Sequence, residues 1–228
     1  MTNLTVCDDF FPYAFVEAEE GEFQGDSLCN FMVDKCPHNA IMSSCQNGKN
    51  TMDRLEDLMK NIILIGMPGT GKSVVGRALA ERLGCTFVDA DDLIAETAGK
   101  TLPEILRTEG LDAFLKIEEE VGTSISCGST VIATGGSMVL SERAMANLRK
   151  DGVVVWLETP LSQISDRMPE DLVDRGIAAP SGMTIREIYR EREPLYARYA
   201  DLIVASRDGE DDTAQQVEAI MRTVGIQL

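Results

Sequence analysis

Residues 66–73 combine glycines, a lysine and a serine in an order that suits the binding of a polyphosphate. They read Gly-Met-Pro-Gly-Thr-Gly-Lys-Ser. Glycines allow backbone torsions that turn several N–H groups toward one anion. The lysine can reach the β- and γ-phosphates of a nucleotide, and the serine hydroxyl can ligate magnesium. The segment therefore predicts a site for a nucleoside triphosphate and Mg²⁺.

The elements predicted on either side of this loop are those that such a loop needs. Residues 61–65 form a short apolar, β-branched run that is typical of a buried strand. Residues 74–83 carry apolar side chains at helical spacing among good helix formers. Phosphates bound between them would lie at the helix N-terminus, where the partial positive charge favours anions. The nucleotide-binding residues expected here are Gly66, Gly69, Thr70, Gly71, Lys72, Ser73 and Val74.

Beyond this loop the chain alternates predicted strands with predicted helices. Strands are expected at 86–89, 130–133, 153–157 and 202–204, and helices at 92–98, 102–108, 111–126, 141–150, 160–167, 184–199 and 212–224. This alternation is typical of an α/β fold with a parallel sheet and helices on both faces. Ligands of such sheets bind at the carboxyl ends of the strands. Asp89 and Asp91 follow the second predicted strand, and Gly135-Gly136 follows the third, so we expect them beside the phosphate loop.

Residues 1–58 differ from the rest of the chain in charge and in pattern. They hold eleven of the 38 acidic residues but three of the 21 basic ones, and they show no sustained helical or strand period. This composition predicts a weakly patterned acidic extension before an α/β domain at 59–228. A start of the protein at Met52 or Met59 is an alternative explanation for the missing pattern.

Three of the four cysteines of this extension lie near the single histidine of the chain. Cys29, Cys36, His38 and Cys45 are residue types that can bind zinc tetrahedrally. Their spacing lacks the close Cys-x2-Cys pairs that are common in zinc sites, which favours scattered cysteines over a metal site. Both explanations stay open.

Composition limits the class of partner and the compartment. The net charge of −17 argues against a nucleic-acid partner, because phosphate backbones select basic surfaces. The chain has no apolar run of about eighteen residues, which a membrane span requires, and no signal-peptide pattern. Six cysteines without a pairing pattern fit a reducing cytosol. We therefore expect a cytoplasmic protein, monomeric, that binds small molecules rather than nucleic acid or membranes.

From Met59 to its C-terminus the chain resembles the shikimate kinases. The features that carry the resemblance are the phosphate loop, Phe87-Val-Asp89-Ala-Asp91, Gly110-x3-Phe114-x3-Glu118, Gly135-Gly136 and Arg192-Glu-Pro194-Leu195-Tyr196. The resemblance implies a P-loop kinase fold, with a five-stranded parallel sheet, helices on both faces and a lid loop at Met168–Met183. It implies an enzyme of amino-acid biosynthesis that uses Mg²⁺ and ATP to phosphorylate a hydroxyl of a small carboxylate, with shikimate as the family's acceptor.

The resemblance assigns catalytic roles to Lys72, Asp91 and Arg175. Asp91 would hold the acceptor hydroxyl and help to remove its proton. Arg175, placed after a one-residue shift in the alignment, would be the lid arginine that reaches the transferred phosphoryl group. Ser73 would ligate magnesium, and Asp89 would lie near the ion and its waters.

The other residues implied by the resemblance bind ATP or the acceptor. Arg167 would lie against the adenine. Gly135 and Gly136 would offer backbone N–H groups to the acceptor at close range. Arg192 would pair with a substrate carboxylate, since a planar guanidinium suits two oxygens, and Asp91 completes the acceptor site.

Each of these side chains also has a purely structural explanation. Asp89 and Asp91 could cap the helix that follows them. Arg175 could lie in solvent on a loop, and Arg192 on a helix. The run Glu118–Glu120 is expected on an exposed helix face.

One position departs from the family pattern. Shikimate kinases carry an arginine that binds the shikimate carboxylate directly after the phenylalanine of the Gly-x3-Phe segment, whereas this chain has Leu115. The loss of one charged hydrogen bond of about 1.5–3 kcal/mol would weaken such a substrate by roughly ten- to over a hundredfold. Lys116 follows, but its side chain points about 100° away along a helix. The same chemistry on another acceptor, such as homoserine, is therefore the alternative to shikimate.

A nucleotide-dependent switch or ATPase module is the alternative outside the kinases. The GTPase motif Asn-Lys-x-Asp is absent, and no later predicted strand ends in the Asp-Glu pair of motor ATPases. An acceptor site and a lid have no purpose in a switch, so the pattern favours the kinase.

Overall fold

Five parallel strands form one sheet in the computed structural model, which describes residues 60–168, 171–206 and 212–224. In spatial order they are β2 (Thr86–Asp89), β3 (Thr130–Ala133), β1 (Asn61–Ile65), β4 (Gly152–Glu158) and β5 (Leu202–Ala205). All five residues of the central strand β1 are buried, as expected of an apolar strand that is covered on both faces. The predicted five-stranded parallel sheet is confirmed.

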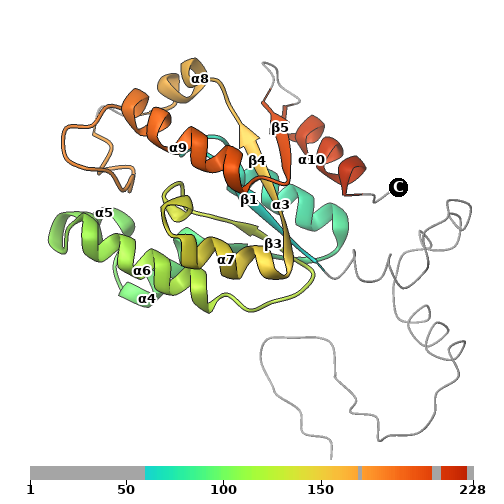
Figure 1. Ribbon diagram of the computed structural model, residues 1–228, viewed down its shortest axis with the longest axis horizontal. Helices are drawn as coiled ribbons and strands as arrows, with labels where there is room; N and C mark the ends of the chain where they lie inside the picture. Colours follow the sequence, from blue (N-terminus) through green and yellow to red (C-terminus); the bar gives the residue numbers. More distant parts are fainter. Residues whose placement is uncertain (1–59, 169–170, 207–211, 225–228) are drawn as a thin grey trace, which may run out of the picture. The chain divides into compact units, whose positions relative to one another are not determined.

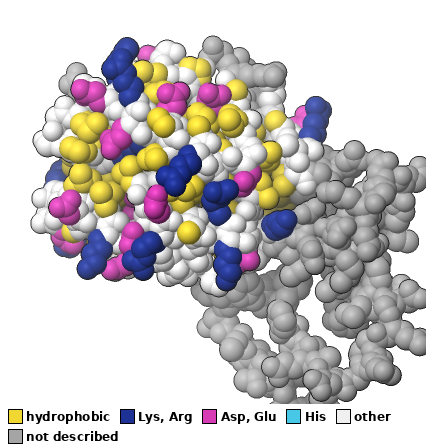
Figure 2. All heavy atoms as spheres, in the orientation of Figure 1, with side chains coloured by type: hydrophobic (Ala, Val, Ile, Leu, Met, Phe, Trp, Pro, Cys, Tyr) yellow, Lys and Arg dark blue, Asp and Glu magenta, His cyan; other side chains and the backbone are white. Residues whose placement is uncertain are grey.

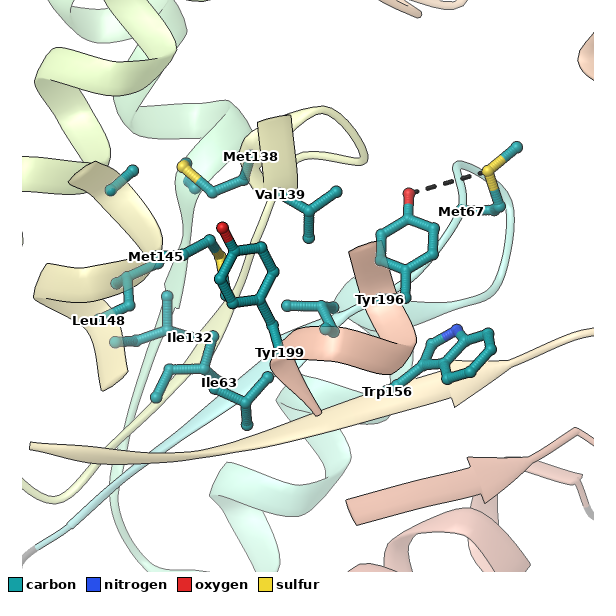
Figure 3. Close-up of a cluster of buried hydrophobic side chains, with 14 of the residues drawn as sticks. Ile63, Met67, Ile132, Met138, Val139, Met145, Leu148, Trp156, Tyr196 and Tyr199 are labelled. Carbon is teal, nitrogen blue, oxygen red and sulfur yellow. Dashed lines mark hydrogen bonds between the residues drawn. The ribbon is translucent and has the colours of Figure 1, made fainter. Parts of the chain in front are cut away.

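Helices cover both faces of the sheet (Figure 1). The elements are α3 (Lys72–Leu83) and α10 (Asp212–Thr223) on one face, and α7 (Glu142–Lys150), α8 (Leu161–Asp166) and α9 (Ile185–Tyr199) on the other. Side chains alternate along a strand, so Ile63 joins the cluster under α7 and α9, whereas Leu64 joins the cluster under α3 and α10. Figure 3 draws the first cluster, with Trp156 from β4 and Tyr199 from α9.

A third cluster lies among α4 (Ala90–Ala98), α5 (Leu102–Thr108) and α6 (Leu111–Ser124). Its buried members are Ile94, Ile105, Phe114, Val121 and Ala178. Ala178 belongs to the stretch predicted as a lid, so this part of the stretch is anchored in a hydrophobic core. Residues 171–183 contain no helix or strand, in agreement with a loop.

Hydrogen bonds at the starts of two helices follow the sequence closely. Thr184 and Glu187 form a capping box at the start of α9, and Thr101 and Glu104 form another at α5. A short 3-10 helix, η2 (Met138–Leu140), follows the Gly135-Gly136 turn and was not predicted. It has three residues, too few to give a periodic signal.

Several expectations fall outside the described residues. They are the acidic extension at 1–58, the candidate zinc ligands Cys29, Cys36, His38 and Cys45, and residues 169–170 of the lid stretch. Within the described residues, no helix is both long and apolar enough to cross a membrane. Figure 2 shows basic and acidic side chains interspersed over the face of the domain that is viewed in Figure 1.

Candidate active site

The phosphate loop lies between β1 and α3 in a conformation that requires its glycines. Gly66 has a φ of 148°, and a Cβ there would lie 2.8 Å from the carbonyl oxygen of Leu157. The Thr70 hydroxyl donates a hydrogen bond to the Met67 carbonyl oxygen at 2.9 Å, which holds the loop closed. Gly71 precedes α3, and no side chain caps this helix. The first N–H groups of α3 are therefore oriented to bind an anion.

Lys72 is buried and folds back over its own loop. Its Nζ donates to the carbonyl oxygens of Gly66 and Met67, both at 2.9 Å. Burial lowers the pKa of Lys72 to about 8, and the carboxylates of Asp91 and Asp89 oppose this shift. A buried ammonium group with a lowered pKa gains from an added anion, such as a phosphate.

Most of the predicted site residues line one cavity of about 350 Å³. Those that line it are Gly69, Gly71, Lys72, Ser73, Val74, Asp91, Gly135, Gly136, Arg175 and Arg192. Those outside the lining are Gly66, Thr70, Asp89 and Arg167. The cavity therefore joins the phosphate loop to groups from α4, the turn after β3, the lid stretch and α9.

The two predicted aspartates have different positions. Asp89 ends β2, and its Oδ1 accepts a hydrogen bond from the Asp91 backbone N–H at 3.2 Å, so Asp89 is the cap of α4. Asp91 lies in the first turn of α4 and faces the cavity. Burial raises the pKa of Asp91, while Lys72 and Arg175 lower it. A carboxylate with a raised pKa is better able to accept a proton from a hydroxyl.

The Gly135-Gly136 turn brings two carboxylates next to the backbone. A Cβ on Gly135 would collide with Oε1 of Glu118 and would lie 2.9 Å from Oδ1 of Asp91. A side chain at position 135 would therefore have to displace both carboxylates. Tyr196 from α9 fixes this turn, because its hydroxyl donates to the Gly136 carbonyl oxygen at 2.7 Å. The same hydroxyl lies 3.7 Å from the sulfur of Met67 in the phosphate loop (Figure 3).

Arg192 is inside the domain rather than on a solvated helix face. It is 2% exposed and lines the cavity. One terminal nitrogen, Nη2, donates to the Ala178 carbonyl oxygen. Nε and Nη1 are buried and have no hydrogen-bond partner among the described residues. Free N–H donors on a buried guanidinium favour a negatively charged partner, such as a carboxylate.

Glu118 corrects the prediction that residues 118–120 form an exposed face. It is 2% exposed and lines the cavity, whereas Glu120 is exposed and Glu119 accepts hydrogen bonds from Ser141 and Arg143. Burial raises the pKa of Glu118 to about 7, against a hydrogen bond from Ser137 that lowers it. Glu118 lies one helical turn after buried Phe114, on the same face of α6, so the spacing in the Gly110-x3-Phe114-x3-Glu118 segment is the sequence signal for its burial.

Comparison with known proteins identifies the family. The family model for shikimate kinase matches residues 68–224 of the chain. This chain belongs to the shikimate kinase family. It is 40% identical over 156 residues to a shikimate kinase of Synechococcus sp. (strain CC9902), covering 67% of this chain and 81% of that one. It is therefore an ATP-dependent small-molecule kinase, and the switch alternative is set aside.

Solved structures of the family have the same fold. Shikimate kinase from Acinetobacter baumannii in complex with shikimate has a TM-score of 0.64 and 29% identity, over 75% of this chain and 96% of that chain. Shikimate kinase from Aquifex aeolicus has a TM-score of 0.60 and 28% identity, over 72% of this chain and 95% of that chain. The predicted P-loop kinase fold is confirmed.

Two arginines of this chain lie at the solvent side of the site. Arg175 is exposed, yet it lines the cavity, and its charge lowers the pKa of Asp91. Arg167 follows α8, and its Nη1 donates to the Gly69 carbonyl oxygen at 3.1 Å. Arg167 is therefore next to the phosphate loop, whereas its expected contact with adenine stays a prediction.

The position that departs from the family pattern is not part of the cavity. Leu115 packs with the hydrophobic cluster among α4, α5 and α6. Lys116 is exposed and does not line the cavity either, so it does not replace the missing arginine. Among the described lining residues of this family member, the cations are Lys72, Arg175 and Arg192.

Proposed function

We propose that this kinase transfers the γ-phosphoryl group of ATP to a hydroxyl of a small carboxylate. The observation that carries the proposal is the convergence of Lys72, Asp91 and Arg192 on one cavity. Lys72 and the start of α3 would bind the phosphates, Asp91 the acceptor hydroxyl and Arg192 the acceptor carboxylate. Arg175 would pair with the transferred phosphoryl group from the lid.

Magnesium fits the oxygen donors at this site. The Ser73 hydroxyl lines the cavity, and the Asp89 carboxylate is close enough to Lys72 to affect its pKa. Oxygen donors of this kind, with phosphate oxygens and water, suit Mg²⁺. The ion would neutralise negative charge on the β- and γ-phosphates.

Shikimate is the first candidate acceptor, and homoserine is the second. Shikimate is supported by the family and by the Acinetobacter baumannii structure, which is a complex with shikimate. The packing of Leu115 away from the cavity changes the acceptor side of the site relative to the family, which supports an acceptor other than shikimate, such as homoserine. Both acceptors carry one carboxylate and a hydroxyl.

The proposal is tested by a coupled assay of ADP release with Mg-ATP and either acceptor. Asp91→Asn keeps the size of the side chain but cannot accept the hydroxyl proton. It should lower acceptor-dependent turnover by on the order of a hundred- to ten-thousandfold. Asp92→Asn is the matched control, because Asp92 is an exposed neighbour in the same helix turn. ADP release that is unaffected by any acceptor, or by Asp91→Asn, would contradict the proposed reaction.

A further inference from the structure

Two buried side chains of opposite charge leave polar atoms unpaired at the same cavity. They are Glu118, through Oε1, and Arg192, through Nε and Nη1. Each side chain is 2% exposed. Buried polar atoms in native proteins are almost always hydrogen-bonded. No described protein group pairs with these three atoms, so their partners come from what fills the cavity, a ligand or the water that the ligand displaces.

Glu118 and Arg192 are not partners of each other. Arg192 is held by its bond from Nη2 to the Ala178 carbonyl oxygen, and Glu118 by its hydrogen bond with Ser137. No ion pair joins the two, although both are described and both are buried. A buried pair that served only the stability of the fold would need direct contact and full hydrogen bonding. A ligand with a negative and a positive group would satisfy both sides.

The other charged groups of the cavity already have a function in the proposed reaction. Lys72 and Arg175 would bind phosphates, and Asp91 would bind the acceptor hydroxyl. Arg192 then remains for a carboxylate. The charges of Arg192 and Lys72 act on Glu118 from within the cavity, but no described cation forms an ion pair with its carboxylate, and Oε1 keeps no hydrogen-bond partner. Leu115 is apolar and packs elsewhere, and Lys116 is exposed, so the turn of α6 before Glu118 does not supply such a cation.

We propose that Glu118 binds an ammonium group of the acceptor, so that the acceptor is a small hydroxylated α-amino acid held between Glu118 and Arg192. This inference rests on the proposed kinase function. The acceptor hydroxyl oxygen would form a bond to the γ-phosphorus as the bond from that phosphorus to the β–γ bridging oxygen breaks. The hydroxyl proton would pass to Asp91, and the products would be ADP and an O-phosphorylated amino acid.

The test compares ligands that differ in the ammonium group alone. Homoserine and 4-hydroxybutyrate share the hydroxyl, the carboxylate and the carbon chain. Titration calorimetry on the full chain with Mg-ADP present should show homoserine binding roughly ten- to a hundredfold more tightly, the range of one charged hydrogen bond. Glu118→Gln should remove this difference and leave the affinity for Mg-ADP unchanged. Glu120→Gln, an exposed position on the same helix, should preserve it.

Equal binding of homoserine and 4-hydroxybutyrate by the unmodified chain would overturn the inference, and this comparison needs no variant to fold. Binding of shikimate that Glu118→Gln leaves unchanged, with no preference for homoserine, would also overturn it. The proposed kinase function is tested by a separate measurement, the release of ADP. Turnover of shikimate without amino-acid binding would refute the ammonium site and keep the kinase. Homoserine binding through Glu118 without ADP release from any acceptor would keep the ammonium site and refute the kinase function.

Discussion

Lys72 carries its positive charge in a buried place, which makes phosphate binding sensitive to pH. Burial lowers the pKa of its ammonium group to about 8, although Asp91 and Asp89 oppose the shift. Only the protonated form can pair with phosphate oxygens, so kcat/KM for ATP should fall as the pH rises through about 8. A pH–rate profile of kcat/KM measures this, because it reports groups of the free enzyme.

The control for this profile is Lys72→Arg. A guanidinium keeps its charge at every pH of the assay, so residual activity of this variant should not fall near pH 8. If kcat/KM of the variant also fell near pH 8, the fall would be caused by a group other than Lys72. Bound phosphates favour the ammonium form, so kcat, which reports the ATP complex, should persist to higher pH.

Residue types and spacing predicted the phosphate side of the cavity more completely than the acceptor side. Lys72 and Ser73 belong to one contiguous motif, so the sequence predicts both their chemistry and their positions. Glu118 stands in a run of three glutamates, and such a run is usually solvated. Its burial depends on the Gly135-Gly136 turn and on Arg192, which come from distant segments. Sequence spacing alone does not contain that convergence.

At the scale of elements, periodicity predicted each strand and α-helix of the described residues within a few residues, and local hydrogen bonding decided the ends. The helix predicted from residue 74 begins at Lys72, because it starts directly after Gly71 of the phosphate loop. The helix predicted from residue 92 begins at Ala90, because Asp89 accepts a hydrogen bond from its first turn. These ends matter for function, since they set which residues face the cavity.

Helix α9 connects the two sides of the site through Tyr196. Removal of its hydroxyl in Tyr196→Phe takes away the hydrogen bond to the Gly136 carbonyl oxygen and the contact with Met67. Loss of one buried hydrogen bond should cost about 1–3 kcal/mol in the free energy of unfolding. The turn next to Asp91 should also loosen, so KM for the acceptor should rise more than KM for ATP. Urea unfolding and steady-state kinetics measure the two effects.

Tyr189→Phe provides the comparison on the same helix. The Tyr189 hydroxyl bonds to Glu193 at 3.1 Å, one turn further along α9, and does not reach the turn or the phosphate loop. Tyr189→Phe should leave KM for ATP and KM for the acceptor near those of the unmodified chain. An equal rise in KM for ATP and acceptor in Tyr196→Phe would show that the hydroxyl supports the whole cavity rather than the acceptor side.

At the scale of the whole molecule, strand order decides which distant residues meet. β1 is central, with β3 on one side and β4 on the other, so the phosphate loop and the Gly135-Gly136 turn emerge from neighbouring strands. β2 pairs with β3 and brings Asp91 to the same edge. This is the edge at which parallel sheets bind ligands. The acceptor side is then closed by α6, α9 and the lid stretch, which supply Glu118, Arg192 and Arg175.

We also propose that residues 59–228 carry the kinase activity without the first 58 residues. The start of β1 is bonded within this part of the chain. The Asn61 side chain donates to the Cys127 carbonyl oxygen at 2.6 Å and accepts from the Thr130 N–H at 3.1 Å, and its backbone N–H donates to the Asp151 carbonyl oxygen at 2.9 Å. A chain that starts at Met59 should therefore keep kcat/KM and unfold within about 2–4 °C of the full chain, the shift that about 1 kcal/mol gives in a domain of this size.

A chain that starts at Leu64 is the contrasting variant, because it lacks Asn61, Ile62 and Ile63 and with them the first half of the central strand. Ile63 is fully buried between β3 and β4, and its loss removes core contacts on one face of the sheet. This shorter chain should not fold, which thermal unfolding and circular dichroism would show. If the chain from Met59 also lost turnover while it kept its cooperative unfolding, residues before 59 would belong to the active enzyme, and the proposed domain boundary would be wrong.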